Sequence, residues 1–304
     1  MQDPQPYFRP VIGRTEHLSP GVRRIVAPNP SPMTFRGTNT YLIGDREVAV
    51  IDPGPLDQAH LAAILAAAGS APISHILVTH AHLDHSPLAR DLALATGAPV
   101  LAYGPAEAGR SDVMQALADA GLVGGGEGVD RDFVPDRIVS DGVVIEGADW
   151  SLRAIHTPGH MANHLAFARD DNLFTGDLVM GWATSLVSPP DGDLSAFMAS
   201  LRRLQTEAWS VFHAGHGAPV HNPAARLQEL IDHRLTREAA ILKALHENSA
   251  DAESLARRIY TDTPPALLPA ASRNVLAHLI DLTQRGLVCP IGEMSAVAVF
   301  AAAS

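Results

Sequence analysis

Four side chains that can bind a metal ion lie within six residues of one another, in the run THAHLDH at residues 79–85. The run directly follows a short apolar stretch that predicts a buried strand. Side chains two apart on an extended segment point the same way, so His80 and His82 can face one ion. Asp84 and His85 fall where the chain turns into a predicted helix, so they can face a second ion beside the first. The alternative, solvated polar residues at a helix N-terminus, is much the weaker interpretation.

Three further candidate ligands each follow a predicted strand. They are His160 in the sequence TPGH, Asp177 in TGD and His216 in GHG. Small residues beside a ligand let the backbone approach an ion closely, and strand ends hold ligands rigidly. Together with the first four, these residues are enough for two ions that share an aspartate. Their nitrogen and oxygen atoms suit zinc, although ligand type alone also allows manganese or iron.

The elements that must position these residues follow an α/β pattern, in which strand, loop and helix alternate. Apolar runs predict strands at 22–26, 40–43, 47–51, 76–78, 100–102, 151–156, 165–168, 173–175 and 210–213. Helical spacing predicts helices at 57–68, 85–96, 194–205 and 223–247, the last beginning at Asn222-Pro223. The Gly- and Asp-rich stretch 104–149, with glycines at 124–126, lacks the ending of a phosphate-binding loop and predicts an insertion or a flexible cover.

The pattern changes beyond Asn248. Helices are predicted at 252–259 and 270–285, and two short strands are predicted around Gly292-Glu293. Two helices and a hairpin in about 55 residues resemble a winged helix.

Composition bounds the kind of protein. The chain has 304 residues, of which 46% are hydrophobic and 18% charged, so it can bury a large core. Its net charge of -11 argues against a primary duplex-DNA binder. A single cysteine, Cys289, excludes internal disulfides. No apolar run is long enough for a membrane helix and no secretory pattern begins the chain, so we expect a soluble cytoplasmic protein with no membrane partner.

The order of the candidate ligands resembles the metallo-β-lactamase superfamily. That resemblance implies an α/β fold, a four-layer αββα sandwich with the metals at the edge of two sheets. A closer resemblance covers nearly the whole chain and points to the β-lactamase-like protein 2 group. It rests on NPSPMT at 29–34, GTNTYLIG at 37–44, GHGAPV at 215–220, HRLTRE at 233–238 and the terminal winged helix. We therefore expect a catalytic domain at 1–222, a connecting helix at 223–248 and a winged-helix domain at 249–304.

The resemblance also implies a role for each candidate ligand. His80, His82 and His160 bind the first of two zinc ions, Asp84, His85 and His216 bind the second, and Asp177 bridges them. The nucleophile is a hydroxide that bridges the ions, and Asp84 is catalytic because it accepts a hydrogen bond from that hydroxide. His156 and His164 flank His160 and either support it or pack in the strands.

Three residues are candidates for the edge of the substrate pocket. Thr38 and Asn39 lie in a glycine-containing loop between early strands, and Trp182 follows the Gly176-Asp177 pair. Burial of the tryptophan in the core is an equally good interpretation.

The resemblance leaves two substrate classes for a zinc-dependent hydrolase. The first is single-stranded RNA, because members of the group are endoribonucleases. The alternative is an acyl thioester, as in glyoxalase II or the polyketide thioesterases. The chain has one lysine, and its local positive spots are Arg234 with Arg237 and the pair Arg257-Arg258, which counts against RNA. A non-catalytic nucleic-acid-binding module is a third hypothesis, and the complete ligand set argues against it.

Overall fold

Two β-sheets face each other in the computed structural model, which describes residues 3–124 and 128–303. Two of the three glycines at 124–126, in the stretch predicted to be an insertion or a flexible cover, therefore lie outside the described residues. In sheet order, the first sheet contains β1 (Glu16–Ser19), β2 (Val22–Val26), β3 (Asn39–Ile43), β4 (Val48–Ile51), β5 (Ile73–Leu77), β6 (Val100–Ala102) and β7 (Arg137–Ile138). The second contains β12 (Val211–Ala214), β11 (Asn172–Gly176), β10 (Leu165–Arg169), β9 (Ser151–His156) and β8 (Val144–Glu146).

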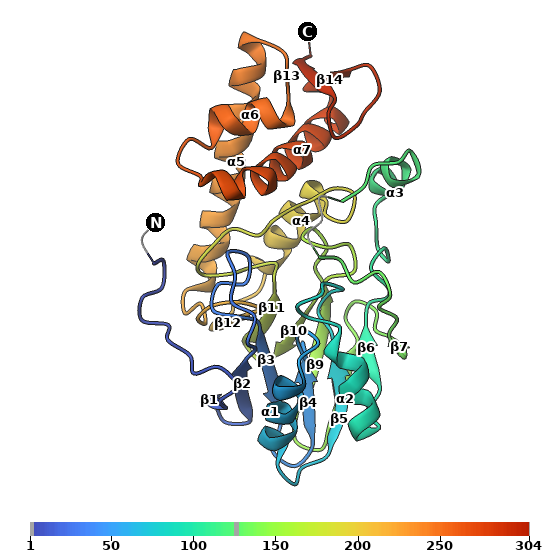
Figure 1. Ribbon diagram of the computed structural model, residues 1–304, viewed down its shortest axis with the longest axis vertical. Helices are drawn as coiled ribbons and strands as arrows, with labels where there is room; N and C mark the ends of the chain where they lie inside the picture. Colours follow the sequence, from blue (N-terminus) through green and yellow to red (C-terminus); the bar gives the residue numbers. More distant parts are fainter. Residues whose placement is uncertain (1–2, 125–127, 304) are drawn as a thin grey trace.

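Helices cover the outer face of each sheet (Figure 1). Helices α1 (Gln58–Ala68) and α2 (Leu88–Thr96) pack on the first sheet, and α4 (Leu194–Leu204) and α5 (Pro223–Glu247) pack on the second. Alternate residues of a strand point to opposite faces. In β4, Val50 accordingly packs against the helices, whereas Ile51 joins a second core between the sheets. The predicted four-layer αββα sandwich is confirmed.

The direction of the strands brings several loops to one edge of the sandwich. Strands β4, β5 and β6 run parallel to one another. In the second sheet, β9 and β11 both run antiparallel to β10, and β12 is parallel to β11. The seven candidate ligands all follow the carboxyl ends of four strands, which are β5, β9, β11 and β12. These ends lie at the same edge of the sandwich.

Local signals set the ends of the helices. The side chain of Asn222 accepts a hydrogen bond from the backbone N–H of Ala225, and Pro223 occupies the first turn of α5, as predicted. Helix α2 starts at Leu88 rather than at the expected His85. Pro87 stands at its N-cap position, and turns that include the bond from the N–H of His85 to the carbonyl of His82 occupy the residues before it. The chain therefore stays irregular where the candidate ligands lie.

The C-terminal part is a winged helix, as predicted. It contains α6 (Ala252–Ile259), a 3-10 turn (Pro265–Leu267), α7 (Leu268–Gln284) and a sheet of β13 (Ala250–Asp251), β15 (Val299–Ala302) and β14 (Val288–Ile291). Figure 1 shows α5 running from the sandwich into this part and α7 lying next to α4. Within the described residues, no helix is both long and apolar enough to span a bilayer.

The described part of the 104–149 stretch is more ordered than the sequence suggests. It contains α3 (Asp112–Asp119) besides β7 and β8. Met114 of α3 and Leu122 are buried in the same core as α5, α6 and α7, so this stretch packs against the winged helix. The hydrophobic spacing of so short a helix is a weak signal in a polar stretch, and only its packing partners reveal it.

Candidate metal centre

Three histidine rings converge at one end of the site. The Nε2 of His80 lies 3.0 Å from the Nδ1 of His82, which in turn lies 3.1 Å from the Nε2 of His160. All three side chains are buried. Three imidazole nitrogens this close together are a typical set of protein ligands for one zinc ion, which leaves a fourth position open.

A second set of side chains converges beside the first. The Oδ2 of Asp84 lies 3.3 Å from the Nε2 of His85 and 3.2 Å from the Nε2 of His216. The Oδ2 of Asp177 lies 3.6 Å from His85, 3.3 Å from His216 and 3.7 Å from His160. Asp177 therefore stands between the two sets, where a shared carboxylate has to be.

Glycines allow the backbone to come this close. A Cβ atom on Gly215 would lie 2.3 Å from the Oδ1 of Asp177, and one on Gly159 would lie 2.3 Å from the backbone of Phe197. Both glycines immediately precede a candidate ligand. At these two positions any side chain larger than that of glycine would clash, which explains why small residues border the ligands.

Backbone and side-chain acceptors fix the orientation of the rings. The Nδ1 of His160 lies 2.7 Å from the carbonyl of Leu186, and the Nδ1 of His216 lies 3.2 Å from the carbonyl of Gly37. The Nδ1 of His85 lies 2.9 Å from Asp52. An N–H donated on one side leaves the other ring nitrogen as a lone pair that faces the cluster.

Asp52 is an important residue that sequence reasoning missed. One of its carboxylate oxygens accepts a hydrogen bond from the backbone N–H of Thr79, and the other accepts from the Thr79 hydroxyl and His85. Its φ of 51° is a strained backbone conformation for a non-glycine residue. The available signal was an Asp-Pro-Gly sequence directly after an apolar strand.

The two histidines that flank His160 differ in role. The Nε2 of His164 accepts a 3.3 Å hydrogen bond from the backbone N–H of Asp177, and its Nδ1 lies 2.8 Å from the hydroxyl of Thr157. His164 thus supports the cluster from behind. His156 stacks on Tyr103, with ring centroids 3.8 Å apart, and its Nε2 lies 2.9 Å from the carbonyl of Ala162 rather than from a candidate ligand.

The three candidates for the pocket edge lie around the His216 loop. The Thr38 hydroxyl donates to Asp84 at 3.1 Å. Asn39 is fully buried, and its amide donates to the carbonyls of Ala214 and Gly217 at 2.9 Å each. Trp182 stacks on Phe35 at 4.9 Å, next to Gly217. Thr38 therefore contacts a candidate ligand, whereas Asn39 holds the backbone on both sides of His216.

The histidines of the two ligand sets have pKa values shifted in opposite directions. Burial, reinforced by His160, lowers the pKa of His82 to about 3, and burial holds the pKa values of His80 and His160 below the usual range. Burial opposes the charged form of His216 as well, but Asp177 and Asp84 outweigh it and raise its pKa to about 10. The same carboxylates raise the pKa of His85.

The aspartates respond to these cations in turn. Burial alone would raise the carboxyl pKa values of Asp84 and Asp177, but the facing His85 and His216 hold both well below the usual range. The Nε2 of His85 and the Oδ1 of Asp177 are buried and have no hydrogen-bond partner among the described residues. Divalent cations would satisfy both atoms and the carboxylate charge, so the residues present fit two metal ions.

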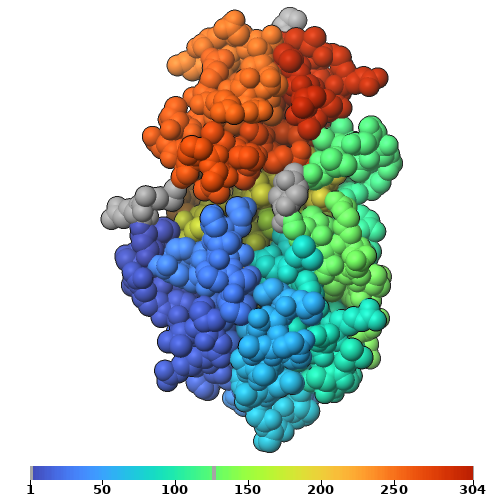
Figure 2. Space-filling view, in the orientation of Figure 1, coloured from blue at the N-terminus to red at the C-terminus, as the bar shows by residue number. Residues whose placement is uncertain are grey.

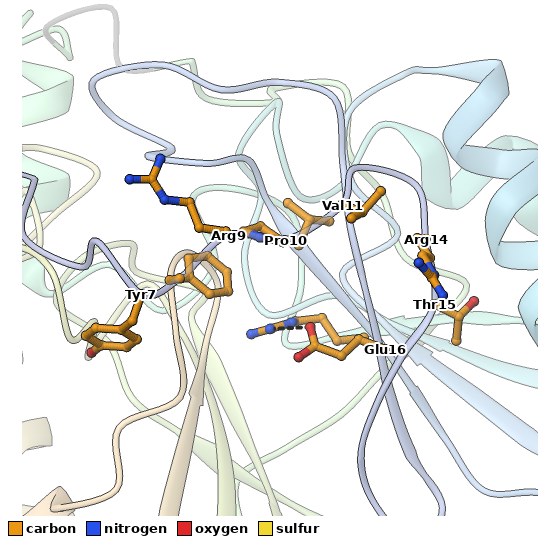
Figure 3. Close-up of a pocket in the computed structure, with 10 residues that line it drawn as sticks. Tyr7, Arg9, Pro10, Val11, Arg14, Thr15 and Glu16 are labelled. Carbon is orange, nitrogen blue, oxygen red and sulfur yellow. Dashed lines mark hydrogen bonds and ion pairs between the residues drawn. The ribbon is translucent and has the colours of Figure 1, made fainter.

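A separate pocket lies at the N-terminal segment, beside β1 and β2. It has a volume of about 390 Å³ and is lined by residues that include Tyr7, Arg9 and Arg14. Figure 3 shows Arg9 and Arg14 on opposite sides of it. Glu16, which also lines the pocket, is paired with Arg24 at 2.6 Å. Its positive groups do not converge on a common point, and no candidate metal ligand lines it.

Comparisons with known families match both parts of the chain. The family model of the metallo-beta-lactamase superfamily matches residues 33–216, and that of the beta-lactamase associated winged helix domain matches residues 252–293. The chain is 30% identical over 282 residues to a beta-lactamase-like protein 2 homolog of Caenorhabditis elegans, covering 90% of this chain and 88% of that protein. It is 32% identical over 244 residues to an atrochrysone carboxyl ACP thioesterase of Aspergillus fumigatus, covering 78% and 68%.

Two solved structures have the same arrangement over nearly the whole chain. A beta-lactamase domain protein from Burkholderia ambifaria superposes with a TM-score of 0.80 at 23% identity, covering 98% of this chain and 96% of that one. A metallo-beta-lactamase family protein from Thermus thermophilus superposes with a TM-score of 0.75 at 27% identity, covering 94% and 100%.

Proposed function

The chain belongs to the metallo-beta-lactamase superfamily, and from that premise we propose that it is a zinc-dependent hydrolase of acyl thioesters. The main observation in support of hydrolase activity is that two sets of candidate ligands lie side by side with Asp177 between them. We assign the first ion to His80, His82 and His160, the second to Asp84, His85 and His216, and the bridging position to Asp177. We also retain the domain division 1–222, 223–248 and 249–304 as a proposal.

The residues of this chain would divide the work of hydrolysis. Bound divalent ions supply Lewis acidity, which polarises the substrate carbonyl and makes a nucleophile available at neutral pH. Asp84 is the candidate ligand with the most exposed side chain, at 26%, and its Oδ2 already accepts a hydrogen bond from Thr38. It therefore faces the open side, where it can accept a hydrogen bond from the attacking water and orient that water toward the carbonyl carbon. The sulfur then leaves as a thiolate when the carbon–sulfur bond breaks.

The surroundings of the site favour an acyl substrate. Leu83, between two candidate ligands, is 52% exposed, and the stacked Phe35 and Trp182 lie beside the His216 loop. Apolar side chains at the rim suit an acyl chain better than the sugar–phosphate backbone of RNA. The thioesterase named among the relatives points to the same chemistry.

The cations that an RNA substrate would need are mostly engaged. Arg234 is only 2% exposed, and the guanidinium of Arg237 lies 4.3 Å from the ring centre of Tyr260. Arg257 pairs with Glu253 at 2.6 Å, and Arg258 pairs with Glu247 at 2.8 Å. Affinity for single strands grows with the number of phosphates that cations neutralise, so these four arginines support RNA binding weakly.

Side-by-side turnover tests the proposal. Zinc-loaded protein would be assayed on an acyl thioester attached to a phosphopantetheine arm and on an end-labelled single-stranded RNA, with chelator-treated protein as the blank. We expect metal-dependent release of free thiol and little RNA cleavage. Arg257→Glu with Arg258→Glu should leave thioester turnover unchanged. Metal-dependent cleavage of the RNA alone would replace the thioester proposal with the ribonuclease.

A further inference from the structure

A buried segment, Ser185 to Ser188, lies between the candidate metal centre and the C-terminal helices. All four of its residues are buried, and it follows the Trp182 loop after β11. In Figure 1 this part of the chain passes between the sandwich and α7. The segment is hydrogen-bonded to candidate ligands on one side and to residues of α5 and α7 on the other.

On the metal side, the segment holds two of the candidate ligands. The carbonyl of Leu186 accepts the Nδ1–H of His160 at 2.7 Å, which fixes the ring and its tautomer. The hydroxyl of Ser185 donates to the backbone carbonyl of Asp177, and it lies 3.0 Å from the carbonyl of Leu178. The position of residues 185 and 186 therefore sets the position of the His160 ring and of the Asp177 backbone.

On the other side, two polar residues of the C-terminal helices hold the segment. The Oδ1 of Asn274 on α7 accepts a 3.0 Å hydrogen bond from the backbone N–H of Val187 and a 2.9 Å bond from Arg234 on α5. The same Arg234 guanidinium donates to the carbonyl of Ser185 and lies 5.0 Å from the ring centre of Phe197. Burial lowers the pKa of Arg234 only to about 10, so it stays charged at neutral pH.

These contacts make it energetically costly to move the Ser185–Val187 segment. If Asn274 lost its acceptor, a buried backbone N–H and a buried guanidinium would each lose a partner. The segment would have to shift to recover them, and the Leu186 carbonyl would move with it. Replacing a direct partner of a metal ligand typically costs about 10- to 100-fold in metal affinity.

We propose that Arg234 and Asn274 are positioning residues of the metal centre, which act through the Ser185–Val187 segment on His160 and Asp177. The winged helix is then a supporting part of the site, since α7 supplies one of the two residues. This inference rests on the proposed metal centre, and it explains why a fully buried arginine stands in α5.

Substitutions at Asn274 separate positioning from general stability. Asn274→Leu keeps the volume and removes the acceptor, whereas Asn274→Asp keeps carboxyl oxygens that can accept both bonds. Ser195→Ala is the matched control, because it breaks the 2.5 Å bond between α4 and Asp281 of α7, which does not lead to the segment. Each full-length variant would be measured for zinc affinity by chelator competition, for its cobalt(II) absorption spectrum and for its melting temperature.

We expect Asn274→Leu to weaken zinc binding by about 10-fold, the lower end of the effect of a direct partner, because Asn274 acts on His160 through the segment. The cobalt spectrum should change as well. Asn274→Asp should keep the wild-type zinc affinity and cobalt spectrum. Ser195→Ala should change only the melting temperature. Should Asn274→Leu fail to fold, Arg234→Met, which keeps an unbranched side chain but can donate to neither Asn274 nor Ser185, carries the test with the same expected direction. Wild-type zinc affinity and cobalt spectrum in the altered protein would overturn the inference. A wild-type protein that binds no metal would instead overturn the proposed function.

Discussion

Asp177 and Asp52 are both buried carboxylates beside His85, and their environments give them different roles. Asp52 has its oxygens filled by hydrogen bonds from Thr79 and His85, so it holds the ligand from behind. Asp177 faces three imidazoles and keeps one buried oxygen without a hydrogen bond among the described residues. An oxygen left open in this way is suited to a cation.

Asp177→Asn should lose one of two bound ions and reduce turnover by several orders of magnitude. A neutral amide cannot bridge two cations or offset their charge. Elemental analysis after zinc incubation and a steady-state assay would measure both effects. Asp171→Asn, an exposed change at the opposite end of β11, is the control. Turnover above about a tenth of the wild-type value would contradict the bridging assignment.

Metal-free protein should lose stability as the pH rises from about 6.5 toward 10. Asp177 and Asp84 overcome the effect of burial and raise the pKa of His216 to about 10, above its unfolded value of 6.5. The bound proton therefore stabilises the fold fully below pH 6.5, and this stabilisation is lost as the pH passes through the folded pKa. Melting temperatures across this range, with chelator and with zinc, would check it.

Zinc should remove most of that pH dependence, because the ion replaces the proton on His216. Parallel curves for metal-free and zinc-loaded protein would show that the ion and this proton do not compete for the site.

At the level of elements, α7 combines two environments along one helix. Asn274 reaches the Val187 backbone, whereas His278, one turn further on, is buried with neither ring nitrogen hydrogen-bonded among the described residues. Burial, and then the nearby cations, of which Arg234 acts most strongly, lower the pKa of His278 to about 3. The helix thus carries a neutral histidine in a position that an apolar side chain could occupy.

His278→Leu should stabilise the protein more at pH 5 than at pH 8. The folded pKa lies below the unfolded value of 6.5, so the unfolded chain takes up the proton first and stability falls as the pH drops from 6.5 toward 3. Leucine removes this loss. Melting temperatures at the two pH values would measure the difference, with His246→Leu at an exposed position of α5 as the control. An equal shift at both pH values would contradict the assigned cause.

For the whole molecule, the sandwich and the winged helix share their cores. Ala277 of α7 packs in the core of α4 and α5, and Met114 of α3 packs in the core of the winged helix. The space-filling view shows the C-terminal part resting directly on the sandwich (Figure 2). The proposed domain boundary therefore crosses buried apolar surface.

Deleting residues 249–304 should give a poorly soluble chain with weakened zinc binding. The deletion exposes Ile241 and Leu245 of α5 and removes Asn274. Solubility, sedimentation and zinc content of the truncated chain would test this. A soluble monomer that keeps two zinc ions at wild-type affinity would mean that the winged helix is separable.

The sequence by itself determined the α/β pattern and the candidate ligands, and the resemblance to a known superfamily added the four-layer sandwich. The pattern and the ligands depend on short-range information: the spacing of His80 and His82, a small residue beside each later ligand, and an apolar strand before each one. The start of α5 was equally local, because Asn222 caps the helix that Pro223 begins.

Only the tertiary structure decided what surrounds those ligands. Asp52 meets Thr79 and His85 across about thirty positions of sequence, and Arg234 meets Asn274 across forty. From the sequence, Arg234 looked like a surface cation for RNA, whereas it is buried against the segment that holds His160. Periodicity reports which face of an element is apolar, but it does not report which distant element covers that face, and this covering sets burial, partners and pKa.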